Sequence, residues 1–183
     1  MTLPGAKTSA FWLALLRIYA GFFWLAHGIP KFLDGEAFLP PSGVMQGFLT
    51  QAAAHMGGWY GAFLTNLVLP HAWVFGQLVR LGEVLAGCSL LLGFYTRLGG
   101  LVGTFLALNY MAAKGLLASP EGWSGLDGAA VVLSAIHLVL PTGRMLGIDG
   151  LLGRVQAPHA VPLERVEPEF VDESPIQGPP AGG

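Results

Sequence analysis

Two charged residues interrupt a long apolar stretch between Gly76 and Gly93. Arg80 and Glu83 stand three residues apart there, and such side chains can hold a carbonyl oxygen or pass on a proton. A charged group at membrane depth costs roughly 2.5–3.5 kcal/mol unless it is paired or hydrated. At about 100° per residue, both charges share a helical face with Gly76 and with a further glycine, Gly87. We therefore expect this face to point into a helix bundle.

Other apolar segments carry similar polar stripes. Arg17, Trp24 and Lys31 follow one another at intervals of seven residues, interleaved with glycines and with His27 beside them. A third stripe runs from Gly99 through Tyr110 to Lys114, with Asn109 beside it, and a fourth runs from Asp127 to His137. Each segment thus presents one polar face, so the segments that carry these residues must pack together.

The composition indicates a membrane protein. Of the 183 residues, 53% are apolar and only 11% are charged, and the mean hydropathy is positive at +0.59. A net charge of −2 lacks the basic surface that binding to nucleic acid requires. No spacing of histidine and cysteine predicts a metal site, and Cys88 stands alone in an apolar run.

Four segments approach the ~20 residues that cross a bilayer. They are residues 9–29, 72–93, 98–118 and 123–140. We expect an all-α integral membrane domain over residues 1–155, built as a four-helix bundle, because the short connections favour antiparallel neighbours. Basic residues gather on the side of the termini, which predicts that both termini are cytoplasmic.

The connection between the first two spans is long. Within it, residues 44–56 place Met45, Leu49 and Ala52 at helical spacing, which predicts an interfacial helix, followed by Trp59 and Tyr60 in an aromatic belt. Residues 63–69 are expected to enter the headgroup region without crossing. The segment 156–183 is rich in proline and glutamate, and we interpret it as a disordered or docking tail.

Aligning the spans by direction brings one group of polar residues into the outer half of the membrane. The group consists of His27, Lys31, Arg80, Glu83, Asn109, Lys114 and Asp127. Arg17 and His137 fall in the inner half, where we expect His137 to cap its helix or contact headgroups.

A quinone suits the outer group because its two carbonyl oxygens need hydrogen-bond donors and become protonated on reduction. Arg80 or His27 could hold a carbonyl oxygen, and Trp24 could stack on the ring. Glu83 or Asp127 could relay protons. The alternative is purely structural: Arg80 and Glu83 would form a buried pair that fixes helix register.

The chain resembles the DoxX/DoxD family of small four-helix membrane proteins. The resemblance lies in RIYAGFFWLAHGIPKF (17–32), GEVLAGCSLLLGFYTR (82–97), Asp127 and PTGRMLGIDGLL (141–152). It implies a membrane subunit of a quinone-linked oxidoreductase, of which the thiosulfate:quinone type is the best defined. By matching position, it supports Arg17, Lys31, Glu83 and Asp127 as shared polar residues, and we expect Arg17 and Lys31 to take part in ligand binding.

Two hypotheses follow for the function. In the first, the chain is the quinone-interacting part or the membrane anchor of an oxidoreductase in the cytoplasmic membrane of a bacterium or archaeon. Its partner subunits would carry the electron-donor chemistry, since the sequence has no flavin or nucleotide motif. In the second, the chain is an accessory subunit that packs at the edge of a larger membrane complex, using its outer loop and tail.

Overall fold

The computed structural model describes residues 4–140, 142–144 and 146–156, and these residues are helical with no strand. The prediction of an all-α chain is therefore confirmed. In chain order the elements are α1 (Pro4–Gly28), α2 (Pro30–Leu33), α3 (Gly35–Phe38), α4 (Val44–His55), α5 (Gly58–Phe63), η1 (Leu64–Val68), α6 (Ala72–Leu92), α7 (Thr96–Ala113), α8 (Pro120–Ser124), α9 (Leu126–Val139), η2 (Thr142–Arg144) and α10 (Ile148–Gln156).

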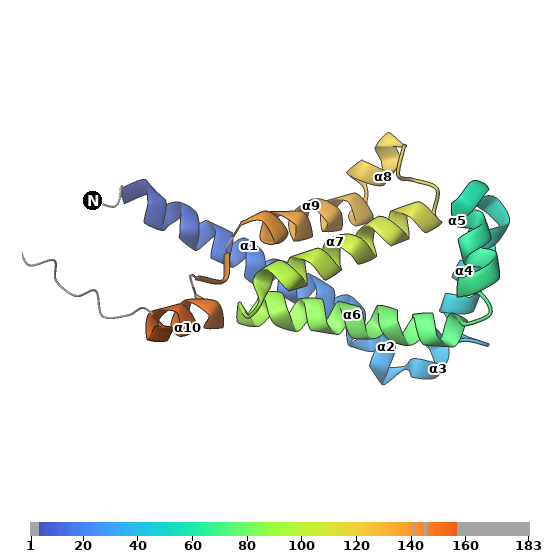
Figure 1. Ribbon diagram of the computed structural model, residues 1–183, viewed down its shortest axis with the longest axis horizontal. Coiled ribbons are helices and arrows are strands. Elements are labelled where there is room, and N and C mark those ends of the chain that lie inside the picture. The colour runs from blue at the N-terminus through green and yellow to red at the C-terminus, as the bar shows by residue number, and fades with distance from the viewer. Residues whose placement is uncertain (1–3, 141, 145, 157–183) are drawn as a thin grey trace, which may run out of the picture.

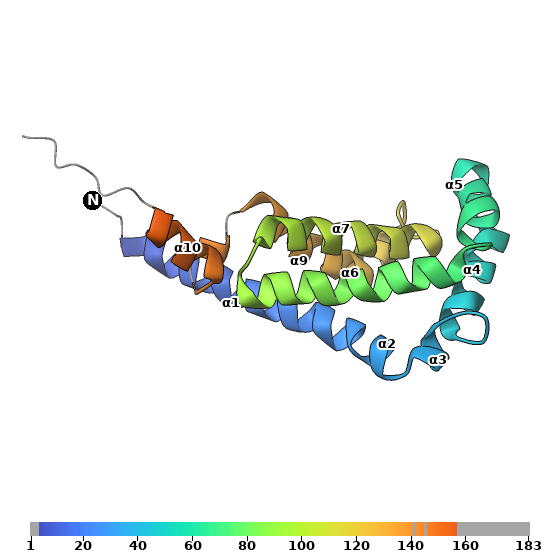
Figure 2. The same ribbon diagram turned by 60° about the horizontal axis from the view of Figure 1, so that its bottom comes forward.

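The four longest helices run side by side (Figures 1 and 2). Helix α1 packs against α6, α6 against α7, and α7 against α9, while a smaller contact between α1 and α9 closes the bundle. The short turn between α6 and α7 makes them antiparallel neighbours, and α9 follows α7 after a longer connection that includes α8. The apolar residues at the centre come from all four helices and include Trp24, Leu90, Met111 and Val131.

Glycines allow the helices to approach closely. A Cβ on Gly21 of α1 would lie 2.4 Å from the backbone nitrogen of Leu91, and one on Gly87 of α6 would lie 2.9 Å from that of Leu25. Small residues at such crossings let backbones meet without a side chain between them. The predicted face of α6 is largely confirmed, since Gly76, Glu83 and Gly87 are buried.

One end of the bundle is covered by the connection between α1 and α6. Figure 1 shows α4 and α5 crossing the ends of the long helices, with α2 and α3 below them. Helix α4 buries Met45, Leu49 and Ala52, as its sequence predicted, and π-helix η1 continues directly from α5. This connection forms the cover of an apolar cluster that includes Phe38 and Leu64.

The opposite end carries α10 and the start of α1, so both described ends of the chain lie there (Figures 1 and 2). Helix α6 ends at Gly93, whose φ of 68° is left-handed and suits a residue without Cβ. Asp149 of α10 then accepts hydrogen bonds from the backbone nitrogens of Tyr95 (3.0 Å) and Thr96 (3.4 Å), which caps α7.

The predicted spans differ from the helices in detail. Helix α1 begins before Ser9, α7 ends at Ala113, and Gly125 in an extended conformation separates α8 from α9. Within the described chain, Thr8–Leu33 and Ala72–Leu92 are long and apolar enough to cross a membrane, whereas Leu126–Val139 is shorter. The proposed tail lies outside the described residues apart from Gln156, which ends α10.

Candidate ligand pocket beneath the α2–α5 cover

A cavity of about 370 Å³ lies at the covered end of the bundle. This volume falls within the range of about 300–1,000 Å³ usual for small-molecule sites. Its lining combines apolar side chains with a few polar ones: Phe23, Trp24, His27, Lys31, Phe38, Val44, Met45, Phe48, Val79, Glu83, Tyr110, Lys114, Leu126, Asp127 and Ala130. Seven helices contribute, α1 to α4, α6, α7 and α9, so the pocket exists only in the folded bundle.

Glu83 is the buried centre of the pocket's polar side. Its side chain is 1% exposed, and its carboxylate accepts hydrogen bonds from Lys31 Nζ at 2.5 and 2.6 Å. The hydroxyl of Tyr110 donates to Glu83 Oε1 at 2.6 Å. We call Lys31, Glu83 and Tyr110 the polar triad. Charge-assisted bonds of this kind compensate a buried carboxylate that would otherwise be costly.

Local sequence explains how the triad meets. Pro30 has no N–H to continue the hydrogen-bonding pattern of α1, so α1 ends at Gly28. A one-residue turn at Ile29, which keeps helical angles, leads directly into the short helix α2. Gly28 brings this turn close to α6, because a Cβ on it would lie 3.0 Å from Glu83 Cβ. Lys31 then reaches Glu83, and its ammonium lies 5.0 Å from the ring centre of Phe38. The ammonium is thus held between a carboxylate and an aromatic face.

A second ion pair lines the pocket. Lys114 Nζ, at the C-terminal end of α7, lies 2.6 Å from Asp127 Oδ2 in the first turn of α9. The Lys114 side chain is 44% exposed and that of Asp127 is 17% exposed, so this pair connects the pocket with its surroundings. The triad, in contrast, is the more deeply buried of the two charged groups.

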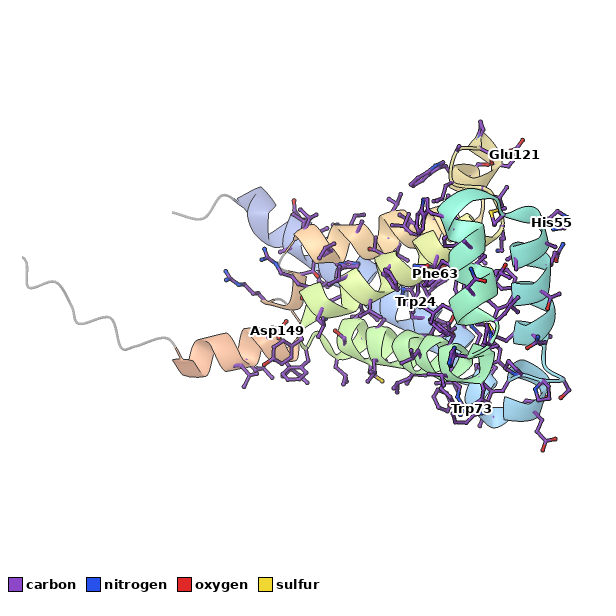
Figure 3. The ribbon with its side chains drawn as sticks, turned by 45° about the vertical axis from the view of Figure 1, so that its right-hand side comes forward. Trp24, His55, Phe63, Trp73, Glu121 and Asp149 are labelled. Carbon is purple, nitrogen blue, oxygen red and sulfur yellow. The ribbon has the colours of Figure 1, made fainter. Side chains whose placement is uncertain are left out.

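Two further candidates from the first span also line the pocket. Trp24 is 2% exposed, and its indole nitrogen donates to Ser134 Oγ at 3.0 Å, which fixes the ring between α1 and α9. Figure 3 shows Trp24 among the long helices. His27 is exposed, and its Nδ1 lies 2.8 Å from the carbonyl oxygen of Phe23. Trp24 is therefore rigidly placed, whereas His27 lies at the margin.

Arg80 is not among the residues that line the pocket. Its Nε donates to Gln77 Oε1 at 2.7 Å, its Nη1 donates to the carbonyl oxygen of Lys31 at 3.3 Å, and its guanidinium stacks 4.3 Å from the Phe32 ring centre. The proposed Arg80–Glu83 pair is therefore wrong. The Arg80 guanidinium instead supports the backbone at Lys31. The Glu83 carboxylate is paired with Lys31.

Arg17 lies apart from the pocket as well. It is fully buried and donates from Nη2 to the carbonyl oxygen of Leu146 at 2.7 Å, near Gly93 and the start of α10. His137 is also fully buried, with Nδ1 3.1 Å from Thr142 Oγ1, so the expected headgroup contact is wrong. The alignment of the spans by direction correctly separated Arg17 and His137 from the outer group of polar residues.

Sequence reasoning gave no role to Tyr110 or Asp149. Tyr110 stands four residues before Lys114 on the same helical face, which was the available signal for a shared site. Asp149 gave no signal, because its partners at Tyr95 and Thr96 are more than 50 residues away. Within the described residues, no cluster of three or more histidine, cysteine or acidic side chains could hold a metal ion.

A family model matches most of the chain. The model described as TQO small subunit DoxD matches residues 12–160, a range that contains every residue of the pocket. No curated protein and no solved structure matches the chain. Since the matched range exceeds half of the sequence, the chain belongs to the DoxD family.

Proposed function

We propose that this chain is a quinone-binding membrane subunit of an oxidoreductase of the thiosulfate:quinone type. In this proposal α1, α6, α7 and α9 cross the cytoplasmic membrane as a four-helix bundle, with α10 and both termini on the cytoplasmic side. The observation that carries the proposal is the polar triad, a buried carboxylate with two hydrogen-bond donors at the wall of a cavity. The family supports the reaction type.

The donors of the pocket fit a quinone headgroup. Lys31 Nζ and the Tyr110 hydroxyl already meet at Glu83, 3.4 Å from each other, so either can turn a proton toward a carbonyl oxygen in the cavity. Trp24 and Phe38 supply flat apolar surface for the ring. A site with few convergent polar groups and mostly apolar walls is the usual form of a small-molecule pocket.

The polar triad and the Lys114–Asp127 pair together suit a route for protons. Reduction of a quinone to a quinol takes up two electrons and two protons. Glu83 holds its carboxylate within 2.6 Å of the Tyr110 hydroxyl, so a proton can pass between them over one hydrogen bond. Asp127 and Lys114, which are more exposed, stand between the cavity and the outside and can replenish protons. Electrons would come from a partner subunit that oxidises thiosulfate to tetrathionate.

Binding of a benzoquinone with a short alkyl chain tests the headgroup site. We expect full-length protein in mild detergent to bind this quinone, as measured by equilibrium dialysis. Lys31→Met should weaken binding about tenfold or more, since a hydrogen bond from a charged donor contributes about 1.5–3 kcal/mol. Arg97→Gln is the matched control, because Arg97 is basic but exposed at the other end of α7.

Two results would overturn the proposal. Wild-type protein that binds no quinone would favour an accessory subunit in which the triad only joins α2 to α6. Equal affinity in wild type, Lys31→Met and Arg97→Gln would place any quinone outside this pocket.

A further inference from the structure

A second cavity, of about 420 Å³, adjoins the first and is also lined by Tyr110. It is bounded by α4, α5, η1, α6 and α7, and its lining is apolar except for Tyr60, Asn109 and Tyr110. Burial raises the pKa of Tyr60 above its ordinary value, so its phenol stays neutral in this wall. No carboxylate or basic side chain lines the cavity, which makes it unsuitable for a charged ligand.

The two cavities share one wall. Met45, Phe48, Val79 and Tyr110 line both of them. Tyr110 donates its hydroxyl to Glu83 at the polar pocket and also lines the apolar cavity. Phe48 is only partly buried and Val79 is aliphatic, so the partition is made of side chains rather than backbone.

The far side of the apolar cavity is not covered by protein. Leu78, Phe105 and Phe63, at its edge, are 57%, 62% and 36% exposed. In a membrane these side chains would face hydrocarbon, so a chain leaving the cavity would enter lipid. The cavity therefore connects the wall of the polar pocket with the bilayer between α5 and α7.

We propose that this apolar cavity holds the isoprenoid chain of a quinone whose headgroup occupies the polar pocket. The inference rests on the proposed function and adds the ligand class: a long-chain lipophilic quinone, which enters from the bilayer past Phe105. A phospholipid acyl chain has the same apolar chemistry, and it is the competing occupant that the test must distinguish. Because the partition between the two cavities consists of side chains, their rotation would open a path for one ligand that uses both cavities.

A photoreactive quinone tests this placement. Full-length protein in phospholipid nanodiscs is labelled with a benzoquinone that carries a diazirine midway along an isoprenoid chain, and the labelled peptides are identified by mass spectrometry. We expect labelling of α4, η1 and the 102–113 part of α7. An excess of short-chain quinone should abolish it, because displacement of the headgroup removes the chain.

Three variants sharpen the test. Val102→Phe fills the apolar cavity and should reduce labelling severalfold, together with the preference for long-chain over short-chain quinone. Leu101→Phe adds the same ring one residue away, at a side chain that is 50% exposed and outside the cavity, and should leave labelling unchanged. Ala113→Leu, a second filling variant, covers the case in which Val102→Phe does not fold.

Each remaining outcome counts against the inference in a recognisable way. Labelling of exposed residues such as Leu98 and Leu101, despite tight short-chain binding, would overturn the chain site alone. Labelling that is removed by added phospholipid but not by short-chain quinone would identify a lipid site. Absence of short-chain binding would overturn the headgroup proposal, and the chain site with it.

Discussion

The two ends of the bundle both bury charged side chains, but only one end keeps a cavity beside them. At the covered end, Glu83 is bonded to Lys31 and Tyr110 at the wall of a 370 Å³ space. At the opposite end, Arg17 is fully buried against Leu146 and the glycines around it, without lining any of the described cavities. Figure 3 shows Asp149 at this closed end, away from His55 on α4.

The two ends show that a polar residue in an apolar helix does not by itself indicate a ligand site. At the closed end, the guanidinium ties α1 to the segment before α10, and Asp149 caps α7. At the open end, the Glu83 carboxylate accepts hydrogen bonds from Lys31 and Tyr110, and space remains beside it for another molecule. Quinone binding should therefore depend on the open end and be insensitive to the closed end.

The largest expected effect comes from breaking the triad. Glu83→Leu leaves the Lys31 ammonium without its carboxylate, and removal of one partner of a buried pair typically costs about 3–5 kcal/mol. We expect a large fall in the thermal unfolding temperature in detergent. The double variant Lys31→Met/Glu83→Leu should recover part of the loss. A double variant less stable than either single variant would show that the pair does not act as a unit.

A smaller loss is expected at the wall of the pocket. Ser134→Ala removes the acceptor of the buried Trp24 indole nitrogen, and an unsatisfied buried donor costs about 1–3 kcal/mol. Thermal unfolding should report the loss, and a freed Trp24 ring should also weaken quinone binding. Ser124→Ala serves as control, because Ser124 is exposed in α8. Equal stability of the two variants would contradict the assigned role of this bond.

At the closed end, Asp149→Asn should affect stability without affecting the ligand. Loss of the charged cap of α7 is expected to cost about 0.5–2 kcal/mol, because the amide is a weaker acceptor for the two backbone nitrogens. Thermal unfolding and quinone binding are measured on the same preparation. A fall in quinone affinity, measured on Asp149→Asn protein that is completely folded, would show that the two ends of the bundle are coupled.

The smallest effect is expected for Arg80→Gln. Arg80 contacts Gln77, Phe32 and the Lys31 carbonyl but does not line the pocket. Quinone affinity should fall by less than about threefold, which corresponds to less than 1 kcal/mol. A loss as large as that of Lys31→Met would return Arg80 to the binding site that sequence reasoning gave it.

Much of this architecture could be predicted from the periodicity and composition of the sequence. The helical segments, the interfacial helix α4 and the inward face of Gly76, Glu83 and Gly87 follow from spacing that the sequence displays directly. The grouping of Lys31, Glu83, Lys114 and Asp127 followed from depth alone. Depth along the axis is a local property, because each residue adds about 1.5 Å.

Partner choice was less predictable, because it depends on the rotation of helices and on side-chain reach. Arg80 and Lys31 are both basic and close in depth, and only the turn at Pro30 decides which one reaches Glu83. The closed end depends on contacts between residues far apart in sequence, such as Arg17 with Leu146. No pattern in one sequence predicts such a pairing.

The most direct test compares quinone affinity in Lys31→Met and Arg17→Met, two variants that remove a basic group from opposite ends of the bundle. Equilibrium dialysis with the short-chain benzoquinone, on folded full-length protein, gives both dissociation constants. The account predicts a loss of about tenfold or more for Lys31→Met and wild-type affinity for Arg17→Met. Equal losses, or a loss confined to Arg17→Met, would contradict it.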